Sequence, residues 1–286
     1  MDYVTLNNGV KMPMLGFGVY RVSKENCEAA VLEAIRSGYR LIDTAQSYFN
    51  EEQVGSAIRS CGVPRAELFI TTKVWIDHYG YEKTRRSVEE SMHKLGVEYL
   101  DLVLLHQAFS DTFGAYRALE DLYREGKRRA IGVSNFLPDR LADFCAFSDI
   151  LPQIDQVEVN PLYQQTAAQA YMGKRGVQME AWAPFGEGRN GIFTNPVLLD
   201  IASQYGKSPA QVILRWLIQR GIVVLAKSIH AERIRENLNI FDFSLTDADM
   251  TRITALDTGK SVFFDFATPD TVDMFVHFVK ARRDQK

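Results

Sequence analysis

Four residues whose side chains could together transfer a proton stand at matching places in the sequence. Asp43, Lys73 and His106 each follow or end an apolar, strand-like run, and Tyr48 comes five residues after Asp43. A phenol with its ordinary pKa of about 10 is a poor acid at neutral pH, but a nearby ammonium stabilises the phenolate and lowers that pKa. We therefore expect Lys73 to lower the pKa of Tyr48, while Asp43 holds the ammonium in place. His106 can align a substrate oxygen, so the set suits protonation of a carbonyl oxygen while hydride reaches its carbon.

Strand-like and helix-like segments that could position these residues alternate eight times. The strand-like segments are mostly apolar, as is typical of a parallel sheet covered on both faces. Such alternation predicts a parallel α/β architecture, and eight units without a Pro/Ser-rich linker favour a closed (β/α)8 TIM barrel over an open sheet. A barrel of this kind takes ~250 residues as one domain. The expected strands are 14–18, 40–42, 68–72, 101–105, 130–133, 153–159, 178–182 and 222–225.

Capping residues mark where the expected helices begin and end. Ser23 can cap a first helix that Gly38 terminates, because Ser is favoured at the N-cap and Gly just past the C-terminus. Prolines 196 and 209 each follow a capping residue and so predict helix starts. The other expected helices are 52–60, 84–95, 113–125, one opened by Pro138, 165–172, 231–239 and a final one from 246 to about 256.

The barrel segment, 14–256, is flanked by two shorter segments of one single-domain chain. Residues 3–13 predict a hairpin, because Asn8 and Gly9 favour a tight type I′ turn. Residues 257–286 are rich in Phe, Asp and charge without a clear period. We expect this tail to be a loop folded over the barrel mouth or a partly disordered end.

Barrel active sites lie at the carboxyl ends of the strands, and several chemically capable residues fall there. Taken by themselves, Asp43 and Lys73 could form an ordinary ion pair, and His106 could be a hydrogen-bonded histidine of the core. Their common location with Tyr48 at one barrel mouth favours the catalytic interpretation. The residues expected at strand ends are Asp43, Lys73, His106, Ser134, Asn135, Gln156, Trp182 and Lys227.

Amides and aromatic rings at these strand ends could hold a flat cofactor and a substrate. Asn135 and Gln156 can pair with a planar carboxamide, although Ser134 and Asn135 could also form a simple capping turn. Trp182 can stack on a ring or belong to the core. Trp75 can line an apolar substrate cleft or pack against a loop.

A second polar group follows the expected eighth strand. Its members could cradle a 2′-phosphate, using two cations, a hydroxyl and a helix N-terminus, or simply form a solvated helix face. A Rossmann site is not indicated, because no glycine fingerprint lies in a first βα unit. The group consists of Lys227, Ser228, Arg233, Glu236 and Asn237.

Composition narrows the classes of partner. The chain is 46% hydrophobic and 24% charged with a net charge of −3, so it has no basic field that would recruit nucleic acid. The amino terminus does not resemble a secretory signal, and no apolar run reaches the length of a membrane span. Three widely spaced cysteines are typical of free thiols in the cytoplasm, and no Cys/His cluster has zinc spacing. We expect a cytoplasmic monomer with neither a metal, a membrane nor a nucleic-acid partner.

Taken together, these motifs resemble those of the aldo-keto reductase family, from about residue 4 to 257. Among its members the chain looks closest to bacterial ones that resemble 2,5-diketo-D-gluconate reductase. The resemblance rests on residues 38–45 with Tyr48 and 50–52, on 72–75, 101–106 and 132–136, and on the group that begins at Lys227.

The resemblance implies roles that composition and spacing do not establish. It implies a (β/α)8 barrel that binds NADPH or NADP⁺, with Tyr48 as the acid, Lys73 and Asp43 tuning it, and His106 orienting a carbonyl. It implies that Ser134, Asn135 and Gln156 bind the carboxamide, that Trp182 stacks on the nicotinamide, and that Lys227, Ser228, Arg233 and Asn237 bind the adenosine phosphate. Tyr20 and Gln107 stand where many members carry Trp, so the substrate pocket is expected to differ there.

We therefore expect NADPH-dependent reduction of a small-molecule aldehyde or ketone to an alcohol. No side chain can donate hydride, so a nicotinamide cofactor is required. Two alternatives remain from sequence alone. One is a barrel aldolase with Lys73 as a Schiff-base nucleophile, and the other is an NADP(H)-binding regulatory subunit without activity, since fold does not dictate function.

Overall fold

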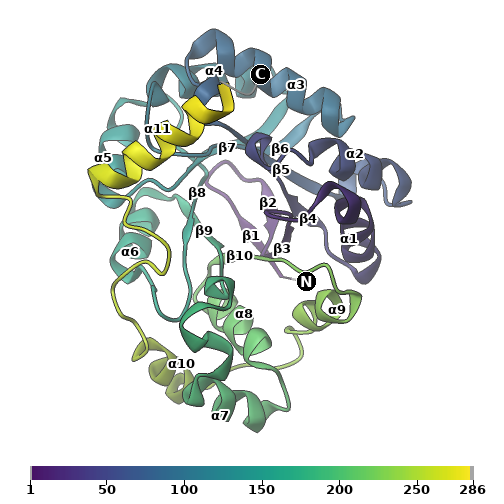
Figure 1. The fold of residues 1–286 in the computed structure, drawn as a ribbon, viewed down its shortest axis with the longest axis vertical. Helices are drawn as coiled ribbons and strands as arrows, with labels where there is room; N and C mark the ends of the chain where they lie inside the picture. Colours follow the sequence, from purple (N-terminus) through teal and green to yellow (C-terminus); the bar gives the residue numbers. More distant parts are fainter. Residues whose placement is uncertain (1, 284–286) are drawn as a thin grey trace.

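Eight parallel strands close into a barrel, in the order β10-β3-β4-β5-β6-β7-β8-β9 (Figure 1). The computed structural model describes residues 2–283. The expected (β/α)8 barrel is confirmed, and each expected strand lies within a few residues of its predicted position. The barrel strands are β3 (Leu15–Gly18), β4 (Leu41–Asp43), β5 (Phe69–Val74), β6 (Leu100–Leu105), β7 (Arg128–Ser134), β8 (Ile154–Glu158), β9 (Gln178–Trp182) and β10 (Val223–Ala226).

The strands are almost entirely buried because side chains fill the barrel inside while helices cover it outside. The residues of β5 and β6 are therefore shielded from solvent, including those near the barrel mouth. The helices are α1 (Lys24–Ser37), α2 (Glu51–Ser60), α3 (Tyr81–Leu95), α4 (Thr112–Arg124), α5 (Pro138–Phe147), α6 (Thr166–Arg175), α7 (Pro196–Tyr205), α8 (Pro209–Gln219), α9 (Ala231–Leu238), α10 (Asp247–Thr254) and α11 (Pro269–Arg283).

The predicted helix caps are mostly present. Asn195 accepts hydrogen bonds from two backbone N–H groups of α7, and Ser208 forms a capping box with Gln211 at the start of α8. Gly38 ends α1 with a φ of 115°, a value that favours glycine. Ser23 is the N-cap residue of α1, as predicted, but its side chain makes no capping hydrogen bond.

The hairpin β1 (Tyr3–Thr5) and β2 (Lys11–Pro13) is present, but its turn differs from the expected one. A type I′ turn requires positive φ at both central residues, and only Gly9 has one, at 84°. The chain instead closes through a longer loop in which the N–H of Leu6 donates to the carbonyl of Val10. Asn8 bonds to the carbonyl of Arg129, which fixes the hairpin near the start of β7.

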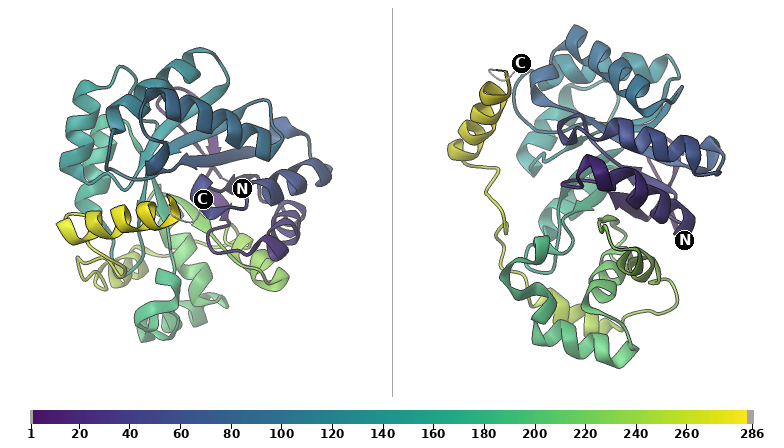
Figure 2. Two further views of the ribbon diagram at one scale, coloured as in Figure 1. Left: turned by 45° about the horizontal axis from the view of Figure 1, so that its top comes forward. Right: turned by 45° about the vertical axis from the view of Figure 1, so that its right-hand side comes forward.

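The C-terminal tail contains a helix that the sequence analysis did not predict. Residues 257–268 form a loop, and α11 follows it, so α10 is not the final helix. Figure 2 shows the loop running along one side of the molecule to α11, on the side opposite the N-terminus. Phe275 of α11 lies against Trp75 and Phe109, which follow β5 and β6. The tail therefore reaches the barrel mouth as expected; residues 284–286 lie outside the described part of the chain.

Two further features concern the cysteines and the length of the helices. Cys27, Cys61 and Cys145 are all free thiols. No helix within residues 2–283 has the length and apolar character that crossing a bilayer requires.

Candidate active site

The four residues proposed for proton transfer come together at the carboxyl-terminal end of the barrel. Asp43 is the last residue of β4, Lys73 lies near the end of β5, and His106 directly follows β6. Tyr48 ends a short 3₁₀ helix, η1 (Gln46–Tyr48), in the loop after β4. Because parallel strands place their carboxyl ends at one edge, three separate βα units supply one site.

Lys73 is the centre of this group. Its ammonium donates hydrogen bonds to Asp43 Oδ1 at 2.5 Å and to the carbonyl of Thr44 at 3.0 Å, and it lies 3.5 Å from the hydroxyl of Tyr48. The side chain of Lys73 is completely inaccessible to solvent. A buried charge is tolerated only when it is paired and hydrogen-bonded, and these partners meet that requirement.

The electrostatics of Tyr48 differ from the sequence-based expectation. Burial raises the pKa of Tyr48 to about 12, although the ammonium of Lys73 opposes that rise. The expectation of a net lowering is therefore wrong, because desolvation of the phenolate outweighs its attraction to Lys73. Burial alone would lower the pKa of Lys73, but Asp43 and Tyr48 outweigh it, so that pKa is raised and Lys73 stays charged.

His106 stands beside the phenol. Its ring centroid lies 5.6 Å from that of Tyr48 and 5.1 Å from that of Trp75, nearly edge-on in both cases. Nδ1 lies 3.4 Å from the hydroxyl of Ser47. The ring is buried against two aromatic neighbours, which restricts its rotation, so His106 and Tyr48 can approach one substrate oxygen together.

A buried carboxyl group that sequence analysis missed lies below this group. Glu180 on β9 accepts a hydrogen bond at 2.9 Å from the amide nitrogen of Gln156, which also donates to Asp43 at 3.1 Å. Gln156 and Glu180 are register partners on β8 and β9. Burial, followed by the charge of Asp43, raises the pKa of Glu180 to about 8. Glu180 lies two residues before Trp182, so the two side chains share one face of β9. No sequence pattern indicated that Glu180 belongs to the site.

Amide and indole groups form a second cluster around Asn135. Trp182 Nε1 donates to Asn135 Oδ1 at 2.9 Å, and Asn135 Nδ2 donates to the carbonyl of His106 at 3.1 Å. The hydroxyl of Ser134 donates to the carbonyl of Gln156 at 2.7 Å. Asn135 has a φ of 64°, a left-handed conformation that Asn adopts more readily than most residues. The indole plane of Trp182 is thus fixed at the end of β9.

The group that follows β10 is polar, and its two cations are its most exposed members. Lys227 and Arg233 are exposed, and neither forms an ion pair or hydrogen bond with the described residues. Ser228 is buried and accepts a hydrogen bond from the backbone N–H of His230. Arg233, Glu236 and Asn237 all lie on α9, where Asn237 is buried as well.

Arg235, which the sequence places among these cations, faces elsewhere. It pairs at 2.7 Å with Glu33 of α1. The free cations of this region are therefore Lys227 and Arg233, at the end of β10 and on the first turn of α9.

The three residues proposed for the substrate pocket surround the phenol and imidazole. The ring of Tyr20 lies 5.0 Å from that of Tyr48 and is half exposed. Trp75 touches His106. Gln107 is buried, and its side-chain oxygen lies 3.5 Å from the amide nitrogen of Asn135.

Further aromatic residues that sequence analysis missed extend the pocket wall. Phe275 of α11 contacts Trp75 with a centroid distance of 6.0 Å and Phe109 at 5.7 Å. Phe263 of the tail lies 5.3 Å from Trp182. No periodic pattern linked these tail residues to the barrel, so only the structure could place them.

A buried carboxylate fastens the tail to the barrel. Glu158 at the end of β8 accepts hydrogen bonds from the hydroxyl of Ser261 at 2.5 Å and from the backbone N–H of Val262 at 3.0 Å. This anchor fixes the chain just before Phe263 and thereby positions the tail beside Trp182.

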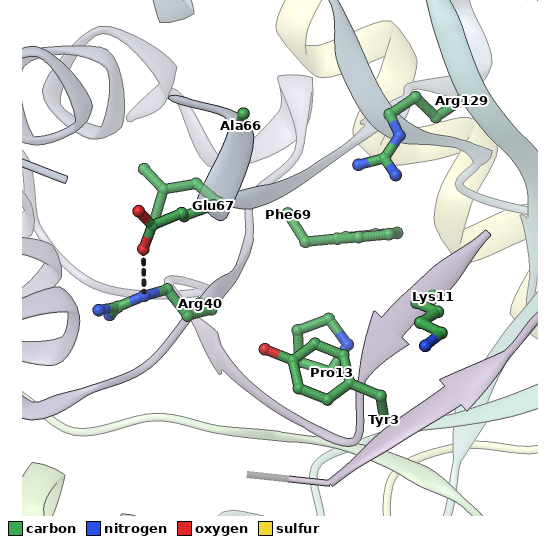
Figure 3. Close-up of a pocket in the computed structure, with 9 residues that line it drawn as sticks. Tyr3, Lys11, Pro13, Arg40, Ala66, Glu67, Phe69 and Arg129 are labelled. Carbon is green, nitrogen blue, oxygen red and sulfur yellow. Dashed lines mark ion pairs between the residues drawn. The ribbon is translucent and has the colours of Figure 1, made fainter. Parts of the chain in front are cut away.

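A separate cavity of about 230 Å³ lies at the opposite end of the barrel (Figure 3). Phe69, the first residue of β5, lines this cavity, and Arg40 pairs there with Glu67 at 4.0 Å. In barrels of this kind this end serves stability rather than chemistry. No cluster of His, Cys, Asp or Glu within residues 2–283 has the arrangement needed to hold a metal ion.

Comparison with known proteins agrees with this geometry. Residues 14–258 match the model of the aldo/keto reductase family. The chain belongs to this family. It is 45% identical to morphine 6-dehydrogenase of Pseudomonas putida, covering 96% of this chain and 98% of that protein. It is 46% identical to glyoxal reductase of Bacillus subtilis, covering 91% of this chain and 95% of that protein.

Solved structures of other aldo-keto reductases superpose closely. An enzyme from a Medee basin deep-sea metagenome library has a TM-score of 0.91 and 42% identity over 93% of this chain and 98% of its own. The Bombyx mori aldo-keto reductase, solved in complex with NADP, has a TM-score of 0.88 and 34% identity over 92% of this chain and 95% of its own. The chain is therefore an NADP(H)-dependent oxidoreductase that acts on carbonyl compounds.

The buried Glu180 gives a test of the site's electrostatics. Its folded-state pKa of about 8 lies above the ordinary 4.5, so between these values the unfolded chain loses a proton that the folded chain keeps. Stability from this group is then full below about pH 4.5 and falls as pH rises toward 8. Glu180→Gln, which cannot ionise, should gain unfolding free energy relative to wild type between pH 5 and pH 8, measured by urea denaturation.

Glu82→Gln, at an exposed position of α3, controls for the loss of a surface carboxylate. A difference between Glu180→Gln and wild type that stays constant from pH 5 to pH 8 would mean that Glu180 is already ionised in the folded protein.

Proposed function

We propose that this aldo-keto reductase reduces aldehydes or ketones with NADPH and that Tyr48 is the general acid. The observation that carries the proposal is the buried ammonium of Lys73, held by Asp43 and 3.5 Å from the hydroxyl of Tyr48. A phenol that stays protonated at neutral pH suits donation to a carbonyl oxygen, and the adjacent ammonium stabilises the phenolate that remains.

In the proposed reaction each residue at the barrel mouth has a separate role. A nicotinamide cofactor bound at the mouth would supply the hydride that the carbonyl carbon needs. His106 holds the carbonyl oxygen near the phenol, and Tyr48 transfers its proton to that oxygen. Lys73 then stabilises the phenolate, while Asp43 keeps the ammonium in place. In the reverse direction Tyr48 accepts the proton of an alcohol.

The residues around Asn135 fit the nicotinamide end of the cofactor. Ser134, Asn135 and Gln156 would bind its carboxamide, and Trp182 would stack on its ring. The amide oxygen of Gln156 makes no hydrogen bond within the described chain, although Gln156 is nearly fully buried. Because both hydrogens of the amide nitrogen are already committed to Asp43 and Glu180, the free oxygen is the atom that fits an amide donor from a ligand.

The group after β10 fits the phosphate end of NADPH. Lys227 and Arg233 are exposed cations without partners among the described residues, which suits capture of the 2′-phosphate that distinguishes NADPH from NADH. Ser228, Glu236 and Asn237 lie beside them on the same turn and helix and would complete the adenosine site.

The pocket wall indicates a substrate with an apolar or aromatic part. Trp75, Phe109 and Phe275 form a continuous aromatic surface beside His106, while Tyr20 and Gln107 add polar groups. A relative named for a large alkaloid and one named for the small dicarbonyl glyoxal are nearly equally similar. The aromatic wall, which the tail helix completes, favours the larger class.

The two alternative functions have less support. A Schiff-base aldolase needs a neutral, reachable amine, whereas Lys73 is inaccessible and its pKa is raised. A regulatory subunit without activity would not need Tyr48, Lys73 and Asp43 in hydrogen-bonding range. Free cysteines support a cytoplasmic location, and we expect the enzyme to act as a monomer because one chain supplies the whole site.

Tyr48→Phe should lower kcat for carbonyl reduction by ~10²–10⁴-fold, since it removes the proton but keeps the ring. The Kd for NADPH, measured by calorimetry, should stay close to that of wild type. Tyr81→Phe, an exposed phenol on α3, is the matched control. Wild-type turnover in Tyr48→Phe with normal NADPH binding would show that Tyr48 is not the acid.

Arg233→Ala should weaken NADPH binding by about tenfold, because a hydrogen bond to a charged group contributes ~1.5–3 kcal/mol before solvent screening. NADH binding should barely change. Arg235→Ala removes a neighbouring arginine that pairs with Glu33 instead and should leave both affinities intact. Equal losses for NADPH and NADH in Arg233→Ala, or a wild-type preference for NADH, would contradict the phosphate site.

Phe275→Ala should raise KM for aromatic ketones by about tenfold, since a buried aromatic side chain contributes about 1.5–3 kcal/mol to an apolar contact. KM for methylglyoxal should change little, because a small dicarbonyl does not reach the wall. Phe147→Ala, which removes an exposed ring on α5, is the control. A uniform change for both substrates would show that α11 does not select between them.

A further inference from the structure

Inside the barrel, one amide joins two carboxyl groups. Gln156 Nε2 donates one hydrogen bond to Asp43 Oδ2 at 3.1 Å and another to Glu180 Oε2 at 2.9 Å. An amide nitrogen carries two hydrogens, so both are committed inside the protein. The only polar atom of Gln156 left for a ligand is its oxygen.

Glu180 and Asp43 together hold the side-chain amide of Gln156 in this orientation. If the amide of Gln156 were flipped, its oxygen would meet the oxygens of both carboxyl groups. Asp43 Oδ1 is already held by Lys73 at 2.5 Å, so Asp43 is fixed mainly by the ion pair. Glu180, in contrast, has Gln156 as its only side-chain hydrogen-bond partner, and its Oε1 has none among the described residues.

We propose that Glu180 is a positioning residue for the cofactor: it holds the NH₂ group of Gln156 inside the barrel, so that Gln156 presents an acceptor oxygen to the NH₂ of the nicotinamide carboxamide. The inference rests on the proposed carboxamide role of Gln156. It adds a residue that acts through Gln156 and that, together with Asp43, sets which atom of Gln156 the cofactor meets.

The charges of the side chains around Glu180 are consistent with this role. The groups facing Glu180 are Asp43 on β4, Lys73 on β5 and Gln156 on β8, while its register partner on β10 is Val223. One cation therefore serves two carboxyl groups, and Lys73 pairs directly with Asp43. When Glu180 is protonated, the group formed by Asp43, Lys73, Gln156 and Glu180 has no net charge. A protonated Glu180 still accepts a hydrogen bond through its carbonyl oxygen, so its role does not require a second buried negative charge.

The distinguishing measurement compares NADP⁺ with 3-acetylpyridine adenine dinucleotide phosphate, in which a methyl group replaces the NH₂ of the carboxamide. Calorimetry gives the Kd of each cofactor without relying on turnover. Wild type should bind NADP⁺ roughly three- to tenfold more tightly, as expected for one neutral hydrogen bond. Glu180→Leu should lose part of this preference, at least about twofold, because Asp43 Oδ2 alone then holds the NH₂ group of Gln156.

Two further variants separate positioning from a structural role. Glu180→Gln keeps an acceptor oxygen for Gln156 and should retain the preference for NADP⁺. Glu180→Leu removes a buried oxygen, Oε1, that has no partner among the described residues, but it leaves one N–H of Gln156 unpaired. Thermal unfolding checks that the variant folds, and Glu180→Met replaces it if it does not. Met179→Leu, the next residue along β9 and therefore on its other face, controls for a change within the strand.

Each outcome decides a separate claim. Equal binding of the two cofactors by wild type would overturn the carboxamide role of Gln156 itself. A preference that Gln156→Ala abolishes but Glu180→Leu and Glu180→Met retain in full would leave Gln156 in its role and overturn that of Glu180. Loss of the preference in Glu180→Gln as well as in Glu180→Leu would also overturn it, because an acceptor at position 180 would then be insufficient.

Discussion

The buried pair of Lys73 and Asp43 is the interaction on which the site depends. Placing an ammonium inside a barrel carries a large desolvation cost, and only a close counter-ion with further hydrogen bonds offsets it. The barrel meets this demand by bringing the ends of β4 and β5 side by side, with the carbonyl of Thr44 as an additional acceptor. Removing either partner would leave an unpaired buried charge, so the pair constrains everything packed around it.

The same pair sets the protonation of its neighbours. Tyr48 experiences attraction from Lys73, but burial and the charge of Asp43 act the other way, so its pKa rises to about 12. Glu180 shares one cation with Asp43 and its pKa rises to about 8. Both groups are consequently in their protonated forms at neutral pH. For a reductase this is the useful state of the phenol, because a proton must be present before it can be transferred.

Sequence patterns predicted the barrel and the place of the proposed catalytic residues because both follow from local signals. Apolar runs mark parallel strands, and the topology gathers their ends, so the sequence alone assigns Asp43, Lys73 and His106 to one mouth. The net effect on Tyr48 could not be predicted, since it is a balance between desolvation and attraction that depends on packing. Glu180 was missed for a related reason: a single carboxyl within an apolar strand gives no sign of which amide it will bond.

The tail illustrates a different limit. Its helix α11 carries an irregular mixture of apolar and charged residues, and its main anchor, Phe275, packs against residues about 170 to 200 positions earlier in the chain. Such contacts have no local signature. Glu158 fixes the segment that leads to α11 by binding Ser261, so the tail is fastened to the barrel that it covers. The proposed catalytic group thus comes from strand ends, whereas part of the aromatic surface beside it comes from a segment outside the barrel. A segment of this kind can vary without changing the strand ends.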